Sequence, residues 1–210
     1  MRSLNSHIKI NSLLDYSKKV KVKNKKLPRI IIVFNEKEFN KNFFLKLKIP
    51  NGAAILLRSY KIKGRKKIAK QLLKFCKIKK LKLLISEDIK LARDINADGV
   101  HFPTYMVKKD IINWSLINKI KIKKNLIITT AIHNSKELEN AQLFDFDAGL
   151  LSPVFPSKSH PNGKSLGIRK FSKLVDKSDL PIYALGGINA KNIKSLFQTD
   201  IIGYAFQRGE

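Results

Sequence analysis

The 210-residue sequence predicts an α/β fold, a TIM (β/α)8 barrel, on three observations. Short β-branched or leucine-rich runs recur eight times, they are hydrophobic throughout, and lysine-rich stretches with helical spacing separate most of them. Continuous hydrophobic runs are typical of parallel strands buried on both faces, and their alternation with helices is the pattern of a barrel. The predicted strands are 29–34, 53–58, 81–86, 98–102, 126–131, 148–152, 181–185 and 201–205.

Helical spacing of the apolar residues is clearest in 65–78, 88–96, 135–144 and 190–197. Before the first strand, residues 1–27 are polar and lysine-rich, with neither the apolar core nor the cleavage site of a signal peptide. We expect them to form a helix and a basic linker. The predicted organisation is therefore a basic N-terminal extension, 1–27, and a barrel, 28–210.

The barrel is expected to lack its last helix, because the sequence stops at Glu210, just after the eighth predicted strand. We expect one of three outcomes for the wall that this helix would cover. The wall could be left open, or the N-terminal segment could cover it. A partner subunit could also cover it, which would make the protein a homo-oligomer.

The formal net charge of +27 suggests a polyanionic partner at first sight. However, only seven of the 43 basic residues are arginine, the residue that nucleic-acid readers favour for bidentate contacts. The lysines are scattered along nearly every segment, which is typical of solvated helix faces. We therefore expect no specific nucleic-acid site, and only weak nonspecific RNA binding at low salt.

Composition also limits the compartment. A hydrophobic content of 43% suits a sizeable core, and no run of about 18 apolar residues could span a membrane. The single cysteine, Cys76, cannot form an internal disulfide, so a cytoplasmic location is expected.

The most informative segments are LLSPVFPSKSHPNGKSLG at 150–167 and PIYALGGI at 181–188. Each is a hydrophobic strand that runs into Gly, Pro, Ser or Lys. Such junctions at the carboxyl ends of strands are where α/β barrels place their chemistry. The functional site is therefore expected mainly in the C-terminal half.

These segments, together with ISEDIKLARDINADGVH at 85–101 and IITTAIHNSKELENA at 127–141, resemble the thiamine phosphate synthase/TenI superfamily over about residues 29–208. The resemblance implies a TIM barrel that binds a thiazole phosphate at the top of its strands. It also implies one of two reactions. The synthase joins a pyrimidine pyrophosphate to thiazole phosphate and releases pyrophosphate with Mg²⁺, whereas the tautomerase shifts a proton to aromatise the thiazole.

The chain departs from the family at the pyrophosphate and metal ligands. The family's Gln-Leu-Arg-x-Lys strand end reads Leu-Leu-Arg-Ser-Tyr, so Arg58 remains as the expected phosphate ligand there. The family's Asn-Asp pair reads Ser86-Glu87, and a second aspartate aligns with Met106. Because Mg²⁺ takes oxygen ligands, Glu87 could serve and Met106 could not. The resemblance therefore implies Mg²⁺ only if synthase activity is retained, and no other cofactor.

Three further regions carry expected phosphate ligands. The family's Thr-x-Thr-Lys loop reads Ser157, Lys158, Ser159 and His160. Gly186 and Gly187 follow the seventh strand, where barrels commonly bind phosphate through backbone N–H groups, although a tight turn would also require glycine. At the end of the chain, the Arg208 guanidinium could replace the missing helix N-terminus, or the residue could belong to a solvated tail.

His133 follows the fifth strand, where tautomerase members of the family use a histidine for proton transfer. An imidazole titrates near about pH 6.5 and can both take and return a proton. Alternatively, His133 only caps the next helix, beside Asn134. His101 lies inside the apolar run GVHF and is expected to be a hydrogen-bonded barrel histidine.

The sequence therefore predicts an enzyme of thiamine biosynthesis that acts on thiazole phosphate. Loss of the metal and pyrophosphate ligands favours tautomerase chemistry over the synthase reaction with pyrimidine pyrophosphate. A noncatalytic barrel that binds thiazole phosphate or thiamine phosphate is the third alternative.

Overall fold

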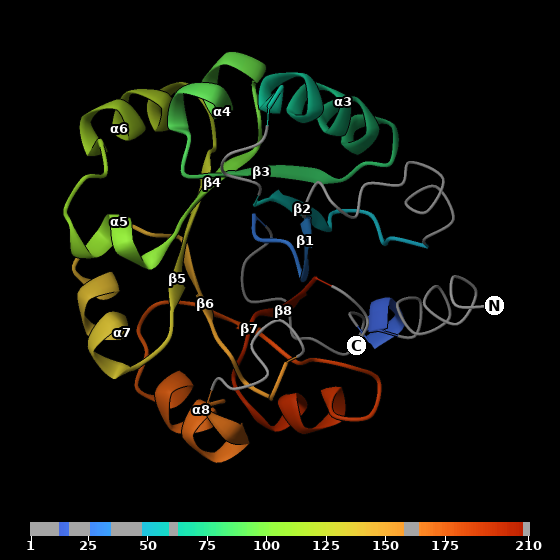
Figure 1. Ribbon diagram of the computed structural model, residues 1–210, viewed down its shortest axis with the longest axis vertical. Coiled ribbons are helices and arrows are strands. Elements are labelled where there is room, and N and C mark those ends of the chain that lie inside the picture. Colours follow the sequence, from blue (N-terminus) through green and yellow to red (C-terminus); the bar gives the residue numbers. More distant parts are fainter. Residues whose placement is uncertain (1–12, 17–25, 35–47, 59–62, 158–163, 208–210) are drawn as a thin grey trace.

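The computed structural model describes residues 13–16, 26–34, 48–58, 63–157 and 164–207. Its centre is a closed barrel of eight parallel strands in sequence order, and β1 closes it by pairing with both β2 and β8 (Figure 1). The strands are β1 (Ile30–Phe34), β2 (Ala54–Leu57), β3 (Lys82–Ser86), β4 (Gly99–Phe102), β5 (Ile127–Ile132), β6 (Ala148–Leu151), β7 (Ile182–Leu185) and β8 (Gly203–Phe206). The predicted TIM barrel is confirmed.

Helices surround the barrel in Figure 1. They are α3 (Arg65–Ile78), α4 (Ile89–Ile95), α5 (Thr104–Lys108), α6 (Trp114–Lys123), α7 (Ser135–Gln142), α8 (Gly167–Asp176) and the 3-10 helix η3 (Ile193–Gln198). In α3, Ala69, Leu72 and Cys76 are buried at helical spacing, and basic residues occupy much of the rest of the helix. This lysine-rich stretch therefore forms a helix that is buried along one stripe of apolar residues.

The last predicted helix, 190–197, is a shorter 3-10 helix that begins at Ile193. The Asn189 side chain accepts a hydrogen bond from Lys191 N, and Asn189 N donates to Asn192 Oδ1 at 2.8 Å. These local bonds stabilise a turn at the positions where a helix was expected to begin.

Side chains of each strand alternate between the barrel interior and the helix layer. Ile31 and Val33 belong to an interior cluster, whereas Ile30, Ile32 and Phe34 belong to the cluster that packs against the helices. This double burial explains why the strands are continuously hydrophobic in sequence.

Residues that precede β1 close the amino-terminal end of the barrel. Leu27 packs into the interior cluster, and the Tyr183 hydroxyl donates a hydrogen bond to Pro28 O at 2.5 Å. Lys26 Nζ forms an ion pair with Asp147 at 2.9 Å. The site must therefore open at the other end of the barrel.

An N-terminal turn covers part of the wall beside β8 (Figure 1). Leu13 and Leu14 are buried in the outer core, and the Tyr16 and Phe197 rings lie 5.8 Å apart. Three outcomes were expected for this wall, and the one observed at residues 13–16 is that the N-terminal segment covers it. The domain boundary at residue 27 stays a prediction. Within the described ranges, no helix is both long and apolar enough to cross a membrane.

Candidate functional site

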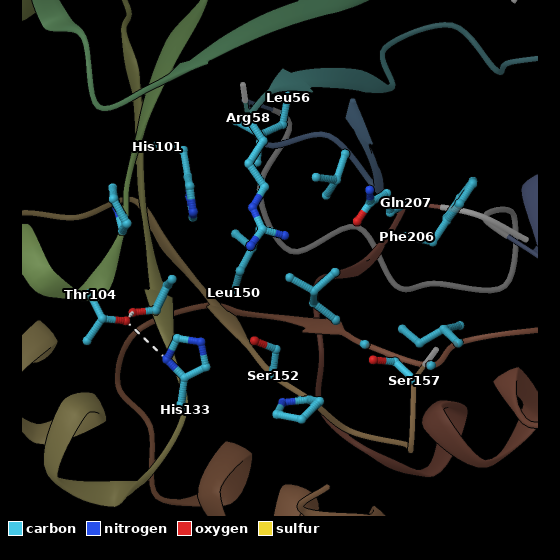
Figure 2. A pocket seen from close by; sticks show the side chains of 18 of the residues that line it. Leu56, Arg58, His101, Thr104, His133, Leu150, Ser152, Ser157, Phe206 and Gln207 are labelled. Carbon is cyan, nitrogen blue, oxygen red and sulfur yellow. Dashed lines mark hydrogen bonds between the residues drawn. The ribbon is translucent and has the colours of Figure 1, made fainter. Parts of the chain in front are cut away.

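A cavity of about 480 Å³ opens at the carboxyl ends of the strands, the end where barrels carry their chemistry (Figure 2). Its apolar floor and walls include Val33, Leu56, Leu150 and Leu185. Its polar lining comes from loops, strand ends and the start of α5, namely Arg58, His101, Thr104, Tyr105, His133, Ser152, Ser157, Lys164 and Gln207.

The turn after β7 contains two glycines whose conformation other residues rarely adopt. Gly186 and Gly187 have φ angles of 97° and 65°. A Cβ atom on Gly187 would lie 2.3 Å from Pro156 O, so only glycine fits against the loop after β6. Val154 N and Phe155 N donate to Leu185 O and Gly186 O, at 2.9 Å and 3.1 Å. The two loops therefore support each other as one wall of the cavity.

This wall offers donors to an anion. Gly187 and Ile188 line the cavity, and no described residue accepts a hydrogen bond from the backbone N–H of either. The Ser157 and Lys164 side chains line the same cavity. Backbone N–H groups with a hydroxyl and an ammonium nearby can bind a phosphate group.

Arg58 supplies positive charge from a different part of the barrel. It follows β2, its backbone N–H donates to Phe34 O at 3.0 Å, and its exposed side chain extends into the cavity. Figure 2 shows Arg58 and Ser157 entering the cavity from separate places. Groups that could attract an anion therefore line the cavity at two separate places.

His101 is the hydrogen-bonded barrel histidine that the sequence predicted. Its side chain is 6% exposed, and its Nδ1 lies 3.0 Å from Thr129 Oγ1. Burial, with the positive charges of Arg58 and His133, lowers the pKa of His101 to about 3. It is therefore a neutral polar group in the cavity lining at physiological pH.

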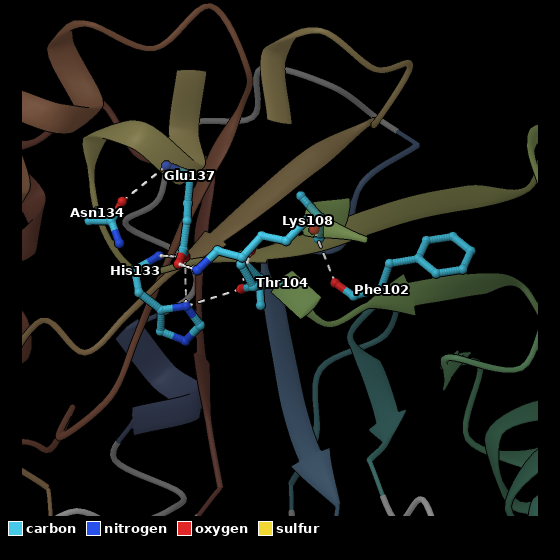
Figure 3. A network of polar contacts seen from close by, with 8 residues as sticks. Phe102, Thr104, Lys108, His133, Asn134 and Glu137 are labelled. Atoms are coloured by element: carbon cyan, nitrogen blue, oxygen red, sulfur yellow. Dashed lines mark hydrogen bonds and ion pairs between the residues drawn. The ribbon is translucent and has the colours of Figure 1, made fainter. Parts of the chain in front are cut away.

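His133 follows β5 and is half-exposed at the cavity wall. Its Nδ1 lies 2.9 Å from Glu137 Oε2 and 3.1 Å from Thr104 Oγ1 (Figure 3). Asn134, and not His133, is the N-cap residue of α7, since its side chain accepts from Glu137 N at 3.0 Å. The catalytic role of His133 stays a prediction.

Glu137 is a neighbour of His133 that the sequence analysis did not assign to the site. Its side chain is 7% exposed, and Lys108 Nζ lies 2.8 Å from Oε1. Burial raises the pKa of Glu137, but hydrogen bonds from Lys108 and His133 outweigh burial and hold the pKa below its usual value. The carboxylate is therefore charged, and its position four residues after His133 is the sequence signal that could have identified it.

The expected metal ligand, Glu87, does not belong to the cavity lining, and its carboxylate accepts a hydrogen bond from the Tyr105 hydroxyl. Met106 lies in α5 and packs against the core. Among the described residues there is no group of three His, Cys, Asp or Glu side chains that could hold a metal ion. Mg²⁺ does not require such a group, since one or two carboxylates and substrate phosphates usually hold it, so the metal-binding role of Glu87 stays a prediction.

The cavity brings together Arg58, His133, Ser157, Gly186 and Gly187 of the predicted site residues. Four others lie outside the described residues and stay predictions, namely Lys158, Ser159, His160 and Arg208. Sequence reasoning also missed several polar lining residues, Thr104, Ser152, Lys164 and Gln207. Thr104, Ser152 and Gln207 closely follow strands, which is the signal that could have found them, whereas Lys164 carries none.

A family model described as thiamine monophosphate synthase matches residues 33–209. The chain belongs to this family. A relative from Aquifex aeolicus, provisionally named thiamine-phosphate synthase 2, is 29% identical over 184 residues, which cover 85% of this chain and 95% of the relative. The thiamine-phosphate synthase of Limosilactobacillus reuteri is 27% identical over 173 residues, or 78% of each chain.

The thiamine monophosphate synthase fold is also seen in a solved structure. Thiamine phosphate pyrophosphorylase from Pyrococcus furiosus superposes with a TM-score of 0.63 at 18% identity, over 86% of this chain and 85% of that one. This likeness shows the fold. Together with the family match, it makes the chain a thiamine-phosphate synthase family enzyme of thiamine biosynthesis.

Proposed function

We propose that this enzyme forms thiamine phosphate by joining a pyrimidine pyrophosphate to thiazole phosphate, with release of pyrophosphate. This is the alternative that the sequence placed second to tautomerisation. The names of the relatives support it, since those aligned above are named as synthases. The observation that carries the proposal is that Arg58 and the Gly187 turn, with Ser157 and Lys164, line one cavity at two separate places.

Two anion positions match two phosphorylated substrates. The Gly187 turn, with Ser157 and Lys164, is suited to the single phosphate of the thiazole. Arg58 presents a planar guanidinium, which suits bidentate contact with a pyrophosphate. A site for the thiazole phosphate alone would need only the first position.

The space between these positions suits the heterocycles. The cavity volume of about 480 Å³ lies within the range of roughly 300–1,000 Å³ that small-molecule sites occupy. Leu56 and Leu150 supply apolar surface on which rings could be buried. No group of three metal-ligating side chains occurs among the described residues, and we assign no step to Mg²⁺.

Thiazole tautomerisation remains a second candidate, and the environment of His133 favours it. An imidazole at the cavity wall, oriented by a buried carboxylate, has the arrangement of a general acid–base catalyst. The tautomerase would need the phosphate position at Gly187 but not Arg58.

The experiment is to incubate the purified protein with the thiazole phosphate tautomer, with and without pyrimidine pyrophosphate and MgCl₂, and to identify products by mass spectrometry. We expect thiamine phosphate only when both substrates are present. Aromatised thiazole phosphate without any thiamine phosphate would replace the proposal by the tautomerase reaction. Binding of thiazole phosphate with neither product would favour the noncatalytic barrel.

A further inference from the structure

We propose that Glu137 and Thr104 hold neutral His133 in the tautomer that carries its hydrogen on Nδ1, so that the Nε2 lone pair faces the cavity. Glu137 is then a positioning residue, since it acts on the substrate only through the imidazole. The inference depends on the proposed function only for the identity of the group that meets Nε2.

Thr104 presents an acceptor to His133. Its hydroxyl has one hydrogen, and Oγ1 lies 3.0 Å from Ala131 O, which can only accept. The hydrogen is therefore directed to this carbonyl. Toward His133 Nδ1, at 3.1 Å, Oγ1 presents a lone pair and acts as an acceptor.

Glu137 presents a second acceptor to His133. Its Oε2 accepts from His133 N at 2.8 Å and lies 2.9 Å from His133 Nδ1. Lys108 donates to the other oxygen at 2.8 Å and keeps the buried carboxylate charged. An ionised carboxylate has no hydrogen to donate. Nδ1 is thus bordered by two acceptors, and a hydrogen on Nδ1 is the arrangement that satisfies both.

The other ring nitrogen faces the cavity. Figure 2 shows the His133 ring at the cavity wall, with the edge opposite the Thr104 contact turned toward the open space. Within the described ranges, the polar contacts of the ring all involve Nδ1. A neutral imidazole with hydrogen on Nδ1 leaves Nε2 free to accept a proton or a hydrogen bond from a substrate.

Helix capping alone does not account for this arrangement. As the third residue of α7, Glu137 is expected to accept from a backbone N–H before the helix, as it does from His133 N. The additional contact with the imidazole and the ion pair with Lys108 on α5 are not parts of a cap. They connect the carboxylate to the site.

The direct test is the tautomer of His133, measured on the ligand-free protein. Long-range ¹H–¹⁵N correlation spectra at pH 8 distinguish protonated from unprotonated ring nitrogens, and His133→Gln assigns the signals. We expect protonated Nδ1 and unprotonated Nε2 in the wild type. A wild-type His133 with hydrogen on Nε2 would overturn the proposal, whatever the enzyme's reaction.

Variants separate positioning from capping. The double variant Glu137→Ala/Thr104→Val removes both acceptors, so we expect His133 to shift toward the Nε2-protonated form that predominates in free imidazole side chains. Asn134→Ala is the matched control, because it removes a cap of the same helix and leaves both acceptors. An equal shift in the control would show that Glu137 and Thr104 act only through helix stability, against the proposal.

Turnover supplies a second readout. If the assay detects tautomerisation, in which His133 would move the proton, the double variant should lower kcat by about 10²-fold or more, the lower range for a positioned acid–base group, and leave KM for thiazole phosphate nearly unchanged. Thr104→Val alone leaves Glu137 Oε2 as an acceptor for Nδ1 and should preserve the tautomer. An Nε2-protonated His133 in this single variant would contradict the acceptor role of Glu137.

Discussion

The Tyr204 hydroxyl donates a hydrogen bond to the carbonyl oxygen of Leu13, across 191 positions of sequence. Both residues are fully buried, so the bond attaches the N-terminal turn directly to β8. The turn is therefore part of the barrel's outer core.

The first prediction tests this attachment. Leu13→Ala should lower the free energy of unfolding by about 2–5 kcal/mol, because it opens a cavity in a packed core. The matched control is Leu143→Ala, since Leu143 is 80% exposed and should change stability by no more than about 0.5 kcal/mol. Denaturant unfolding measures both values. Equal effects would mean that the turn does not stabilise the barrel.

A second prediction concerns Arg58. Arg58→Gln should lower kcat/KM for pyrimidine pyrophosphate by about 10- to 150-fold, since a hydrogen bond to a charged group contributes roughly 1.5–3 kcal/mol. The KM for thiazole phosphate should change little, because we propose that the Gly187 turn binds that phosphate. Arg93→Gln serves as the control, since Arg93 is exposed on α4 and pairs with Asp94. Steady-state kinetics with each substrate varied in turn measure both values. An equal loss of kcat/KM for the two substrates would contradict the assignment of Arg58 to the pyrophosphate.

A third prediction follows from the neutral, buried His101. The pKa of His101 in the folded protein is about 3, below its ordinary value of 6.5. At a pH between these two values, the imidazole is protonated in the unfolded chain and neutral in the folded protein. Stability from this group is present above about pH 6.5 and is lost as the pH falls, by up to about 1.4 kcal/mol per pH unit.

The measurement compares wild type with His101→Gln, which can still bond Thr129 but does not titrate. The wild-type advantage in the free energy of unfolding should shrink by about 2 kcal/mol between pH 6.5 and pH 5. Equilibrium unfolding across this range, with the same buffers for both proteins, decides the matter. An advantage that stays constant would show that His101 is not buried in its neutral form.

The fourth prediction concerns the glycine turn. Gly187→Ala should destabilise the protein and weaken binding of inorganic phosphate, because the added Cβ meets the backbone oxygens of Pro156 and Phe155. Gly52→Ala is the control, since Gly52 also has a positive φ but no atom within 4 Å of the added Cβ. The control should show only the conformational cost, about 1–2 kcal/mol. Calorimetry should find phosphate binding weakened in Gly187→Ala and unchanged in Gly52→Ala.

Much of the barrel was predictable from sequence, because strands buried on both faces must be hydrophobic along their whole length. The predicted strand 81–86 is observed as Lys82–Ser86, and the helix predicted at 65–78 has those bounds in the structure. The sequence also predicted that motif residues such as Arg58, His133 and Gly187 lie in one site. Each follows a predicted strand, and the carboxyl ends of parallel strands meet at one end of a barrel.

Only the tertiary structure decided which side chains meet. Leu13 packs beside β8, and Lys108 pairs with Glu137. Both contacts join segments that are distant in sequence or belong to different helices. Local patterns carry no information about such pairs. Glu137 illustrates the difference. Its sequence position predicts a helix cap, whereas its burial against His133 and Lys108, set by the packing of α5 on α7, makes its carboxylate part of the site.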